Sequence, residues 1–333
     1  MTRLRRGVQT FIMLLCLWAG WRLYLSVGHF LNNGPAVPGP AAVDGFLPIG
    51  GLMGLKLWLS TGIFDRVHPA AIVILSAAML VSVLFKKGFC GWICPVGTLS
   101  EALWKTGGKI FGRHFKLNRS VDYWLRSVKY LLLAFFALTV LLMSTWTLAA
   151  FLNGPYWATA DARMLLFFEH LSATAAVVLA GLVIGSLFYG NFWCRYFCPY
   201  GALLGLLGLL SPARITRDER ACIHCGACVK NCPASIPIDK KKAIRTPECN
   251  GCLACVAGCP APGALTVGFG KLPAGDAGKD RVFSRKAAFL YAVLLIAVFF
   301  GVVSAAMATG HWASGAPPAG YRALISLTRV FKK

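Results

Sequence analysis

The sequence predicts an α-helical polytopic membrane protein that carries one small cysteine-rich insert. Of its 333 residues, 57% are hydrophobic and only 14% are charged, whereas a soluble domain contains about 25% charged residues. Twelve of the thirteen cysteines fall into four short clusters. The composition therefore predicts membrane spans, and the clustering predicts metal ligation in a reducing compartment rather than disulfides.

Five apolar stretches are long enough to cross a bilayer core, which takes about 20 residues. They are Val8–Val27, Pro69–Phe85, Tyr130–Phe151, Leu171–Phe192 and Ala287–Ala308. The first stretch exceeds the usual apolar core of a signal peptide and contains Arg22, so we expect an uncleaved anchor. The apolar segment Gly45–Leu59 is broken by Pro48, by three glycines after it and by Lys56. We therefore expect an interfacial or re-entrant piece at the outer face rather than a sixth span.

Lys and Arg residues are distributed unevenly between the two sides of the predicted spans. With the N-terminus inside, 25 of the 34 lie on that side and seven on the other. Because basic loops stay in the cytoplasm, the bias predicts a multi-pass protein of the bacterial plasma (inner) membrane with all four cysteine clusters in the cytoplasm. The same loops account for the formal charge of +22. The sequence contains no basic stripe interleaved with aromatic residues, so we expect no nucleic-acid partner.

These patterns divide the chain into seven segments. They are an N-terminal anchor (1–30), an extracytoplasmic or interfacial segment (31–68), a transmembrane core (69–212), a cysteine-rich cytoplasmic domain (213–268), a linker (269–286), a C-terminal transmembrane helix (287–309) and an extracytoplasmic tail (310–333). Within the core, CGWICPVGTL and CRYFCPYGAL match at both cysteines, the proline, the glycine and the last leucine, 104 residues apart. Each copy follows an inward-running span, which indicates a duplication with parallel topology.

Two cysteine runs in the insert have the spacing C-x2-C-x2-C-x3-C-P. The first is Cys222, Cys225, Cys228 and Cys232, and the second is Cys249, Cys252, Cys255 and Cys259. The spacing is typical of bacterial ferredoxins with two [4Fe-4S] clusters, in which the fourth cysteine of each run binds the other cluster. We therefore expect an α+β ferredoxin-like domain with these ligand sets: Cys222, Cys225, Cys228 and Cys259 for cluster 1, and Cys249, Cys252, Cys255 and Cys232 for cluster 2. A pair of zinc sites is the alternative, and two complete runs with trailing prolines disfavour it.

Two C-x3-C-P motifs accompany the duplication, with Cys90 and Cys94 in the first and Cys194 and Cys198 in the second. On a helix this spacing places both thiols on one face. We expect these four cysteines to form a third redox centre or metal site, or to act as dithiols, and the alternative is that they are small packing residues. Their duplication favours a functional role. Cys16, alone in the first span, is expected to pack or to face lipid.

The motifs CGWICP and CRYFCP, with the eight cysteines of the two runs, resemble the NapH/NosR-type family of membrane-bound ferredoxins over about residues 70–267. That family includes the quinol-oxidising subunit associated with periplasmic nitrate reductase and the C-terminal half of a maturation protein for nitrous-oxide reductase. The resemblance implies cytoplasmic clusters and paired motifs that take part in electron transfer. This chain lacks the large extracytoplasmic flavin-binding region of the second relative, so no covalent flavin is expected.

Electrons need a carrier between the two membrane faces, because a bilayer core is about 30 Å thick. No histidine lies in the middle of a predicted span, which disfavours a bis-histidine haem. Quinone is the simplest mobile carrier. Six polar residues near the outer face are candidates for a quinol pocket or a metal site, with solvated boundary residues as the alternative: His29, Asp65, His68, Asp161, Glu169 and His170.

The sequence thus predicts an electron-transfer component that connects the quinone pool with a soluble or membrane-bound redox partner. Two alternatives remain, a copper reductase that matures a respiratory metalloenzyme through the C-x3-C-P cysteines and a membrane redox sensor. Lys240–Lys242 and Arg245 are expected to tune a cluster, to dock an acidic donor or simply to form a solvated loop. No catalytic triad, nucleotide-binding glycine loop or acid-base pair predicts an independent hydrolase, kinase or dehydrogenase.

Overall fold

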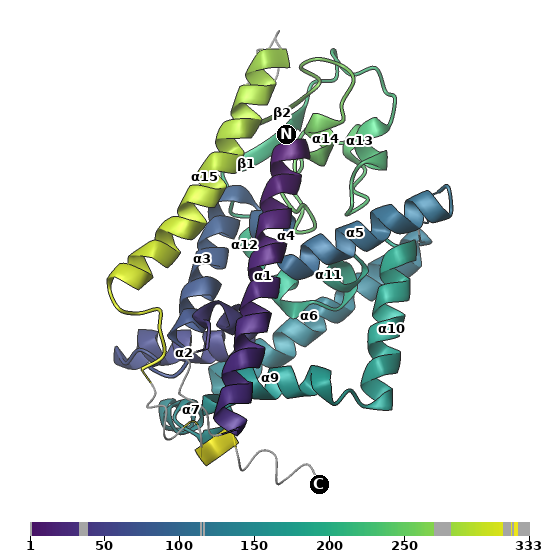
Figure 1. Cartoon of the computed structure of the whole chain (residues 1–333). Helices are drawn as coiled ribbons and strands as arrows, with labels where there is room; N and C mark the ends of the chain where they lie inside the picture. Colours follow the sequence, from purple (N-terminus) through teal and green to yellow (C-terminus); the bar gives the residue numbers. More distant parts are fainter. Residues whose placement is uncertain are drawn as a thin grey trace. The chain divides into compact units, whose positions relative to one another are not determined.

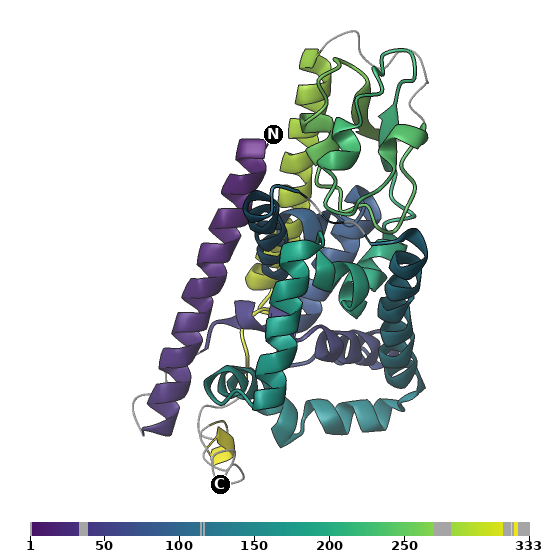
Figure 2. The same cartoon turned by 90° about the vertical axis from the view of Figure 1, so that its right-hand side faces the viewer.

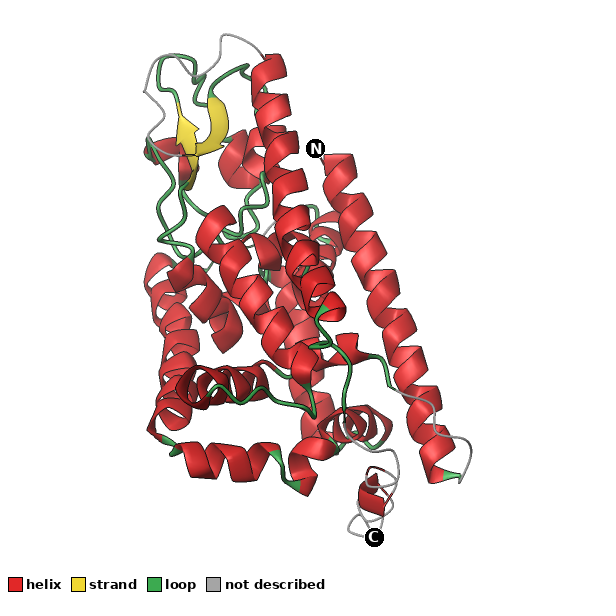
Figure 3. Cartoon of the chain, turned by 90° about the vertical axis from the view of Figure 1, so that its left-hand side faces the viewer, coloured by secondary structure: helices red, strands yellow, loops and turns green. Residues whose placement is uncertain are grey.

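The computed structural model describes residues 2–32, 39–113, 115, 117–269, 281–315, 321 and 323–325. This described part is mostly helical and contains two strands (Figure 3). The chain forms two compact units. The first comprises Met1–Met13, Ala78–Leu133 and Val178–Phe300, and the second comprises Leu14–Ala77, Ala134–Val177 and Gly301–Lys333.

Among the described residues, three helices are long and apolar enough to cross a membrane: α1 (Thr2–Leu31), α6 (Arg119–Leu142) and α15 (Arg281–Ala308). Helices α9 (Ala160–Glu169) and α10 (Ala173–Phe188) meet that test only as a pair, and they are bent by 85° at the break between them. Helix α3 (Pro69–Phe85) is apolar but has only 17 residues. Three of the five predicted spans are therefore single long helices, and the other two regions are a shorter helix and part of a bent pair.

The third span differs most from its predicted range, Tyr130–Phe151. Helix α6 begins eleven residues earlier, at Arg119, and ends at Leu142. The Ser144 hydroxyl accepts a hydrogen bond from the backbone N–H of Thr147 at 3.1 Å, which caps a new helix, α7 (Thr145–Leu152). An N-terminal cap of this kind starts a helix even inside an apolar stretch.

The duplicated sequence folds into the same order of elements twice. In the first copy, α3 is followed by α4 (Gly88–Trp92) and α5 (Pro95–Ile110), and in the second, α10 is followed by α11 (Phe192–Tyr196) and α12 (Pro199–Leu207). The starts of all three elements are 104 residues apart. Each third helix begins with proline, whose fixed backbone angle suits the first helical position.

The cysteine runs lie between two antiparallel strands, β1 (Ala213–Arg217) and β2 (Leu265–Phe269). Their register pairs Ala213 with Phe269 and Arg217 with Leu265. Between the strands lie α13 (Ala227–Lys230), η2 (Ile238–Lys240) and α14 (Ala254–Ala257). The first half of α15 runs beside this group (Figure 1, Figure 2), where the Phe85 ring packs against both Tyr291 and Phe269.

The second unit contains η1 (Ala41–Phe46), α2 (Pro48–Thr61) and α8 (Pro155–Ala158) together with α7 and α9. The segment predicted as a surface piece, Gly45–Leu59, largely forms α2, whose Leu57 is buried against α7 and α8. The Lys56 ammonium donates to the carbonyl oxygens of Val140, Leu141 and Met143. A basic side chain that satisfies terminal carbonyls stabilises the end of a helix, here α6.

Candidate metal centres

The two cysteine runs adopt the same backbone path, 27 residues apart. His224 and Gly251 both have a positive φ, at 52° and 56°, and so do Gly226 and Leu253, at 68° and 55°. Each short helix, α13 or α14, begins directly after the second of these residues. Left-handed residues in such a loop turn successive backbone N–H groups toward one side, which forms a concave site for an anionic group.

The structure gathers the eight cysteines around two cavities. The first cavity is lined by Cys222, Cys225, Cys228 and Cys259, and the second by Cys232, Cys249, Cys252 and Cys255. Each cavity therefore receives three cysteines from one run and the fourth from the other. In each run the third cysteine lies in the short helix, Cys228 in α13 and Cys255 in α14, and the fourth cysteine follows the end of that helix.

The donors and lining of both cavities fit an iron-sulfur cluster, which is held by four cysteine thiolates. Aliphatic side chains complete much of the second cavity: Ile215, Ile236, Ile238, Ile244 and Leu253. Such a lining keeps water from the sulfur atoms of a bound group. Within the described residues, no three His, Cys, Asp or Glu side chains are arranged to hold a single metal ion.

The C-x3-C-P cysteines do not share a helix face, and that part of the prediction is wrong. Cys90 lies in α4, but Cys94 has extended backbone angles and is the residue before α5. In the second copy Cys194 lies in α11, and Cys198 is extended in the same way before α12. The cause is the proline that follows, since its ring disfavours a helical conformation for the preceding residue.

The four motif cysteines nevertheless lie in one neighbourhood, called here the four-cysteine site (Cys90, Cys94, Cys194 and Cys198). Burial raises the pKa of the Cys194 thiol well above its usual value, and the charges of the other three raise it further. The Cys198 sulfur accepts a hydrogen bond from the backbone N–H of Gly201 at 3.2 Å. The two motifs therefore lie close enough for the charges of their cysteines to act on one another, and thiolates are donors that suit iron-sulfur clusters and soft metal ions.

The second cavity adjoins the first C-x3-C-P motif. The Trp92 indole N–H donates to the carbonyl oxygen of Gly251 at 3.0 Å. Gly91 packs so closely that a Cβ atom there would lie 2.4 Å from the Asn250 carbonyl oxygen and 3.4 Å from the Cys252 Cβ. Only glycine permits this approach of two backbones. The motif residues thus hold the loop that carries Cys249 and Cys252.

The second copy of the duplication contacts the same insert. A Cβ atom at Gly190 would lie 2.4 Å from the carbonyl oxygen of Pro233, which follows Cys232. A Cβ atom at Gly205, in α12, would lie 2.6 Å from the carbonyl oxygen of Pro247. Both copies therefore support the loops of the second cavity through glycine contacts.

The start of α1 also fixes the first motif, a role that the sequence did not indicate. Arg5 and Gln9 both donate to the carbonyl oxygen of Gly91, at 2.9 and 3.2 Å. The Arg5 guanidinium also forms a buried bidentate ion pair with Glu101 of α5. In the sequence, Arg5 is only one of several basic residues near the N-terminus.

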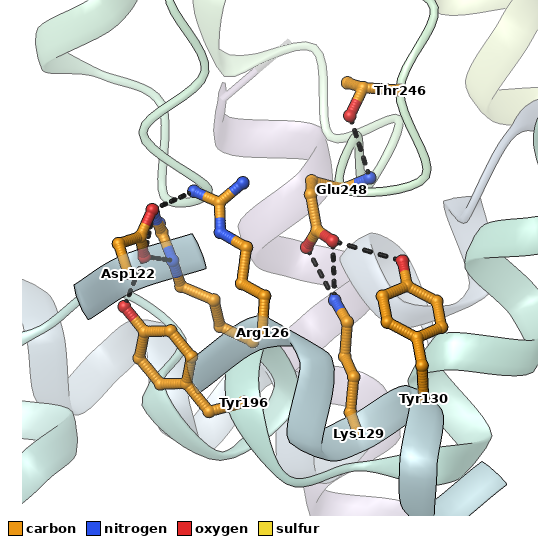
Figure 4. Close-up of polar contacts among 8 residues, drawn as sticks. Asp122, Arg126, Lys129, Tyr130, Tyr196, Thr246 and Glu248 are labelled. Carbon is orange, nitrogen blue, oxygen red and sulfur yellow. Dashed lines mark hydrogen bonds and ion pairs between the residues drawn. The ribbon is translucent and has the colours of Figure 1, made fainter. Parts of the chain in front are cut away.

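A buried ion pair connects α6 to the loop of the second run (Figure 4). The Lys129 ammonium donates to both oxygens of the Glu248 carboxylate at 2.7 Å, and Glu248 directly precedes Cys249. The Tyr130 hydroxyl donates to the same carboxylate at 3.3 Å. Burial alone would raise the pKa of Glu248, but the charges of Lys129 and Lys87 lower it below its usual value. A lysine in a helix of membrane length, such as Lys129, is the signal in the sequence that indicates a buried ion-pair partner.

A second charged group lies on the same helix (Figure 4). The Asp122 carboxylate accepts two hydrogen bonds from Arg195, both at 2.9 Å, and one from the Tyr196 hydroxyl at 2.6 Å. Arg126 also pairs with Asp122. Since Arg195 and Tyr196 belong to α11, this group fixes the helix of the second motif against α6.

The six polar residues that were predicted near the outer face do not form one site. His68 pairs with Asp44 through Nδ1 and with the Trp157 carbonyl oxygen through Nε2, both at 2.9 Å. The Trp157 indole donates to Asp65 at 2.8 Å. Asp161 accepts from the Tyr321 hydroxyl and lies close enough for its charge to act on His68 and Asp44. Of the other three residues, His29 is half-buried, and Glu169 and His170 are exposed. His68 and Asp65 are therefore parts of a buried polar group that also contains Asp44, which the sequence analysis missed.

Comparisons with known proteins agree with the cysteine chemistry. A family described as "4Fe-4S binding domain" matches residues 67–118 and 171–217. A second, described as "4Fe-4S dicluster domain", matches residues 214–260. The first match contains both C-x3-C-P motifs, and the second contains the two cysteine runs. No solved structure matches the chain.

Among its relatives is YccM of Escherichia coli, whose name assigns it provisionally to electron transport. The two are 41% identical over 326 residues, which cover 97% of this chain and 90% of YccM. The ferredoxin-type protein NapH of the same organism is 30% identical over 50% of this chain and 55% of its own length. The methylamine utilization ferredoxin-type protein MauN of Methylorubrum extorquens is 29% identical over 49% of this chain and 54% of its own. The chain therefore belongs to the family of NapH-type membrane ferredoxins.

Proposed function

We propose that this protein transfers electrons between the membrane quinone pool and a redox partner protein through two [4Fe-4S] clusters. Cluster 1 is held by Cys222, Cys225, Cys228 and Cys259, and cluster 2 by Cys249, Cys252, Cys255 and Cys232. The observation that carries this proposal is the pair of cavities, each lined by four cysteines from both runs. When bound, each cluster supplies one-electron redox chemistry.

The contacts of the insert suggest an order for the centres. Trp92 and Gly91 hold the Cys249–Cys252 loop directly against the first C-x3-C-P motif. Cluster 2 is therefore the one next to the four-cysteine site. Oxidation of one quinol to quinone releases two electrons and two protons, and the two clusters, when bound, would supply one acceptor for each electron.

The four-cysteine site is the candidate for a third centre. Its support is the family described as a 4Fe-4S binding domain, whose match includes Cys90, Cys94, Cys194 and Cys198 but ends before the first cysteine of the ferredoxin runs. The thiols are also close enough to raise one another's pKa. We propose that this centre is the one nearest to the quinone.

The proposed location is the bacterial inner membrane, with the N-terminus and the insert in the cytoplasm. Three candidate spans support a membrane location. The excess of Lys and Arg in the segments that carry the cysteines supports the orientation, because basic segments are retained in the cytoplasm.

The proposal is tested by low-temperature EPR spectroscopy of protein purified without oxygen, reduced in parallel with dithionite and with a quinol analogue. Iron and sulfide are counted in the same samples. We expect cluster signals with both reductants, about eight irons for the two clusters alone, and about twelve if the four-cysteine site holds a third. Signals with dithionite alone would contradict quinol as the donor.

A second candidate function is reduction of a metal ion such as copper during maturation of a respiratory enzyme. The observation that favours it is the neighbourhood of four cysteines, of which Cys90 and Cys194 are buried, because thiolates are soft ligands suited to Cu(I). In that case, replacing Cys90 and Cys194 by serine abolishes metal reduction while both clusters remain and quinol oxidation is unchanged. Loss of quinol oxidation in the same variant favours the relay instead.

A further inference from the structure

Two consecutive lysines directly follow α3, and both are buried. Their exposed fractions are 5% for Lys86 and 2% for Lys87. Lysine is almost never fully buried unless it has a charged or polar partner. Neither residue has a role in the function proposed above.

The two side chains reach different parts of the first unit. The Lys86 ammonium donates to the carbonyl oxygen of Ile244, in the insert, at 3.0 Å. The Lys87 ammonium instead lies beside Gly201, near the start of α12. If Gly201 carried a Cβ atom, that atom would be 3.2 Å from the Lys87 Nζ. The backbone of Lys86 has a positive φ of 56°, which is uncommon for a residue with a side chain.

The surroundings of Lys87 are those of the four-cysteine site. Gly201 donates its N–H to the Cys198 sulfur, and the Cys194 carbonyl oxygen lies 3.5 Å from the same Cβ position at Gly201. The groups that act most strongly on the ammonium are Cys90, Glu248, Cys194 and Cys198. Burial alone would lower the pKa of Lys87, but these groups raise it above its usual value, so the ammonium stays charged.

Glu248 alone does not account for this charge. Both of its carboxylate oxygens accept hydrogen bonds from Lys129 at 2.7 Å. The other three groups that act on Lys87 are the motif cysteines Cys90, Cys194 and Cys198, which carry a negative charge only as thiolates. Their thiolates, when they bind a metal group, require a compensating positive charge in an environment without water.

We propose that Lys87 is the counter-charge of the four-cysteine site and that its ammonium raises the reduction potential of the group bound there. The inference depends on the third centre proposed above. An iron-sulfur cluster becomes more negative by one charge when it is reduced, and a nearby fixed cation stabilises that reduced form. Lys87 is a positioning residue in this role, since it acts through charge and not as a ligand.

The test replaces Lys87 by methionine, which is unbranched and only one atom shorter and removes the charge. The matched control is Lys86→Met, which removes the same charge from the adjacent buried position. Iron is counted, and the potential of each centre is measured by EPR redox titration in the whole purified protein. We expect Lys87→Met to shift the potential of the four-cysteine centre to more negative values and to leave that of cluster 1 unchanged. Lys86→Met should leave the four-cysteine centre unchanged.

The outcomes separate this inference from the function on which it rests. About twelve irons with an unchanged potential in Lys87→Met would exclude the role of Lys87 but not the third centre. Equal shifts of the potential in Lys87→Met and Lys86→Met would also exclude that role. About eight irons in the unmodified protein would exclude the third centre and, with it, this role. If Lys87→Met loses only the third group of irons, Lys87→Arg decides: retention of that group in the arginine variant supports a requirement for charge, and its loss contradicts it.

Discussion

Lys129 of α6 donates to both carboxylate oxygens of Glu248 at 2.7 Å. Glu248 directly precedes Cys249, which is a candidate ligand of cluster 2. A helix of membrane length and the second cysteine run are thereby joined by one buried ion pair. Lys129 is fully buried, with an exposed fraction of 0%. Removal of either partner leaves the other charge buried without compensation.

We therefore expect Lys129→Met to lower the free energy of unfolding by about 3–5 kcal/mol. The double variant Lys129→Met/Glu248→Gln should recover part of this loss, because no buried charge is left alone. Thermal unfolding in detergent measures both effects. The control is Lys105→Met, whose partly exposed ion pair with Glu101 should contribute less than about 1 kcal/mol. Strictly additive losses in the double variant would contradict the coupling.

The close approach of Gly91 to Asn250 gives a second prediction. Gly91→Ala places a Cβ atom 2.4 Å from a backbone oxygen, so the Cys249–Cys252 loop has to move. We expect a loss of about 1–3 kcal/mol in stability and selective loss of the irons of cluster 2. Gly181→Ala is the control, because a Cβ atom there meets nothing within 4 Å. Iron analysis of the two variants compares them directly, and equal iron contents would exclude this tight packing.

The crossed ligand sets give a third prediction. Cys259→Ser should remove cluster 1, although Cys259 belongs to the second run, and Cys232→Ser should remove cluster 2. The EPR spectrum of each variant identifies the cluster that remains by comparison with Cys222→Ser and Cys249→Ser. Cys259→Ser should match Cys222→Ser. A match with Cys249→Ser would show that each run holds its own cluster.

The buried His68 gives a prediction about pH. Burial opposes its charge, but the hydrogen bond and charge of Asp44, together with the charge of Asp161, raise the pKa of His68 above its usual value. A raised pKa means that the folded protein binds the proton more tightly than the unfolded chain does. The resulting stability is therefore complete below about pH 6.5, the unfolded value, and is lost as the pH rises through the folded value.

The measurement is the unfolding temperature of the protein and of His68→Gln between pH 6 and pH 9. The unmodified protein should lose stability across this range, and the variant should lose less. Asp44 has the same sign, since burial raises its pKa as well. Identical pH profiles in the two proteins would mean that His68 does not titrate in this interval.

Patterns in the sequence were sufficient to predict the parts of the site that occur twice in the chain. The starts of α4 and α11 and of α5 and α12 follow the duplication, and the cysteine spacing predicted which four residues line each cavity. The helix starts depend on neighbours within a few residues, whereas the grouping of the cysteines follows from the characteristic spacing of both runs together. The helix face predicted for Cys90 and Cys94 failed at Pro95, whose effect on the preceding residue outweighs the helical spacing.

The contacts that position the site could not be predicted in the same way. Lys129 and Glu248 are 119 residues apart, and Trp92 and Gly251 are 159 apart. No periodicity identifies partners at such separations, and a single sequence offers no covariation. Likewise, His68 was recognised as a polar residue near a boundary, whereas its partner Asp44 became evident only from the fold.

The duplication has a consequence for the stoichiometry of the four-cysteine site. One copy of the repeat provides Cys90 and Cys94, and the other provides Cys194 and Cys198, so neither copy alone carries the complete set. A protein with a single repeat would need a second molecule to assemble four thiols, and its site would depend on protein concentration. Fusion of the two copies in one chain makes assembly of the site an intramolecular event, with the partner always present at a high effective concentration.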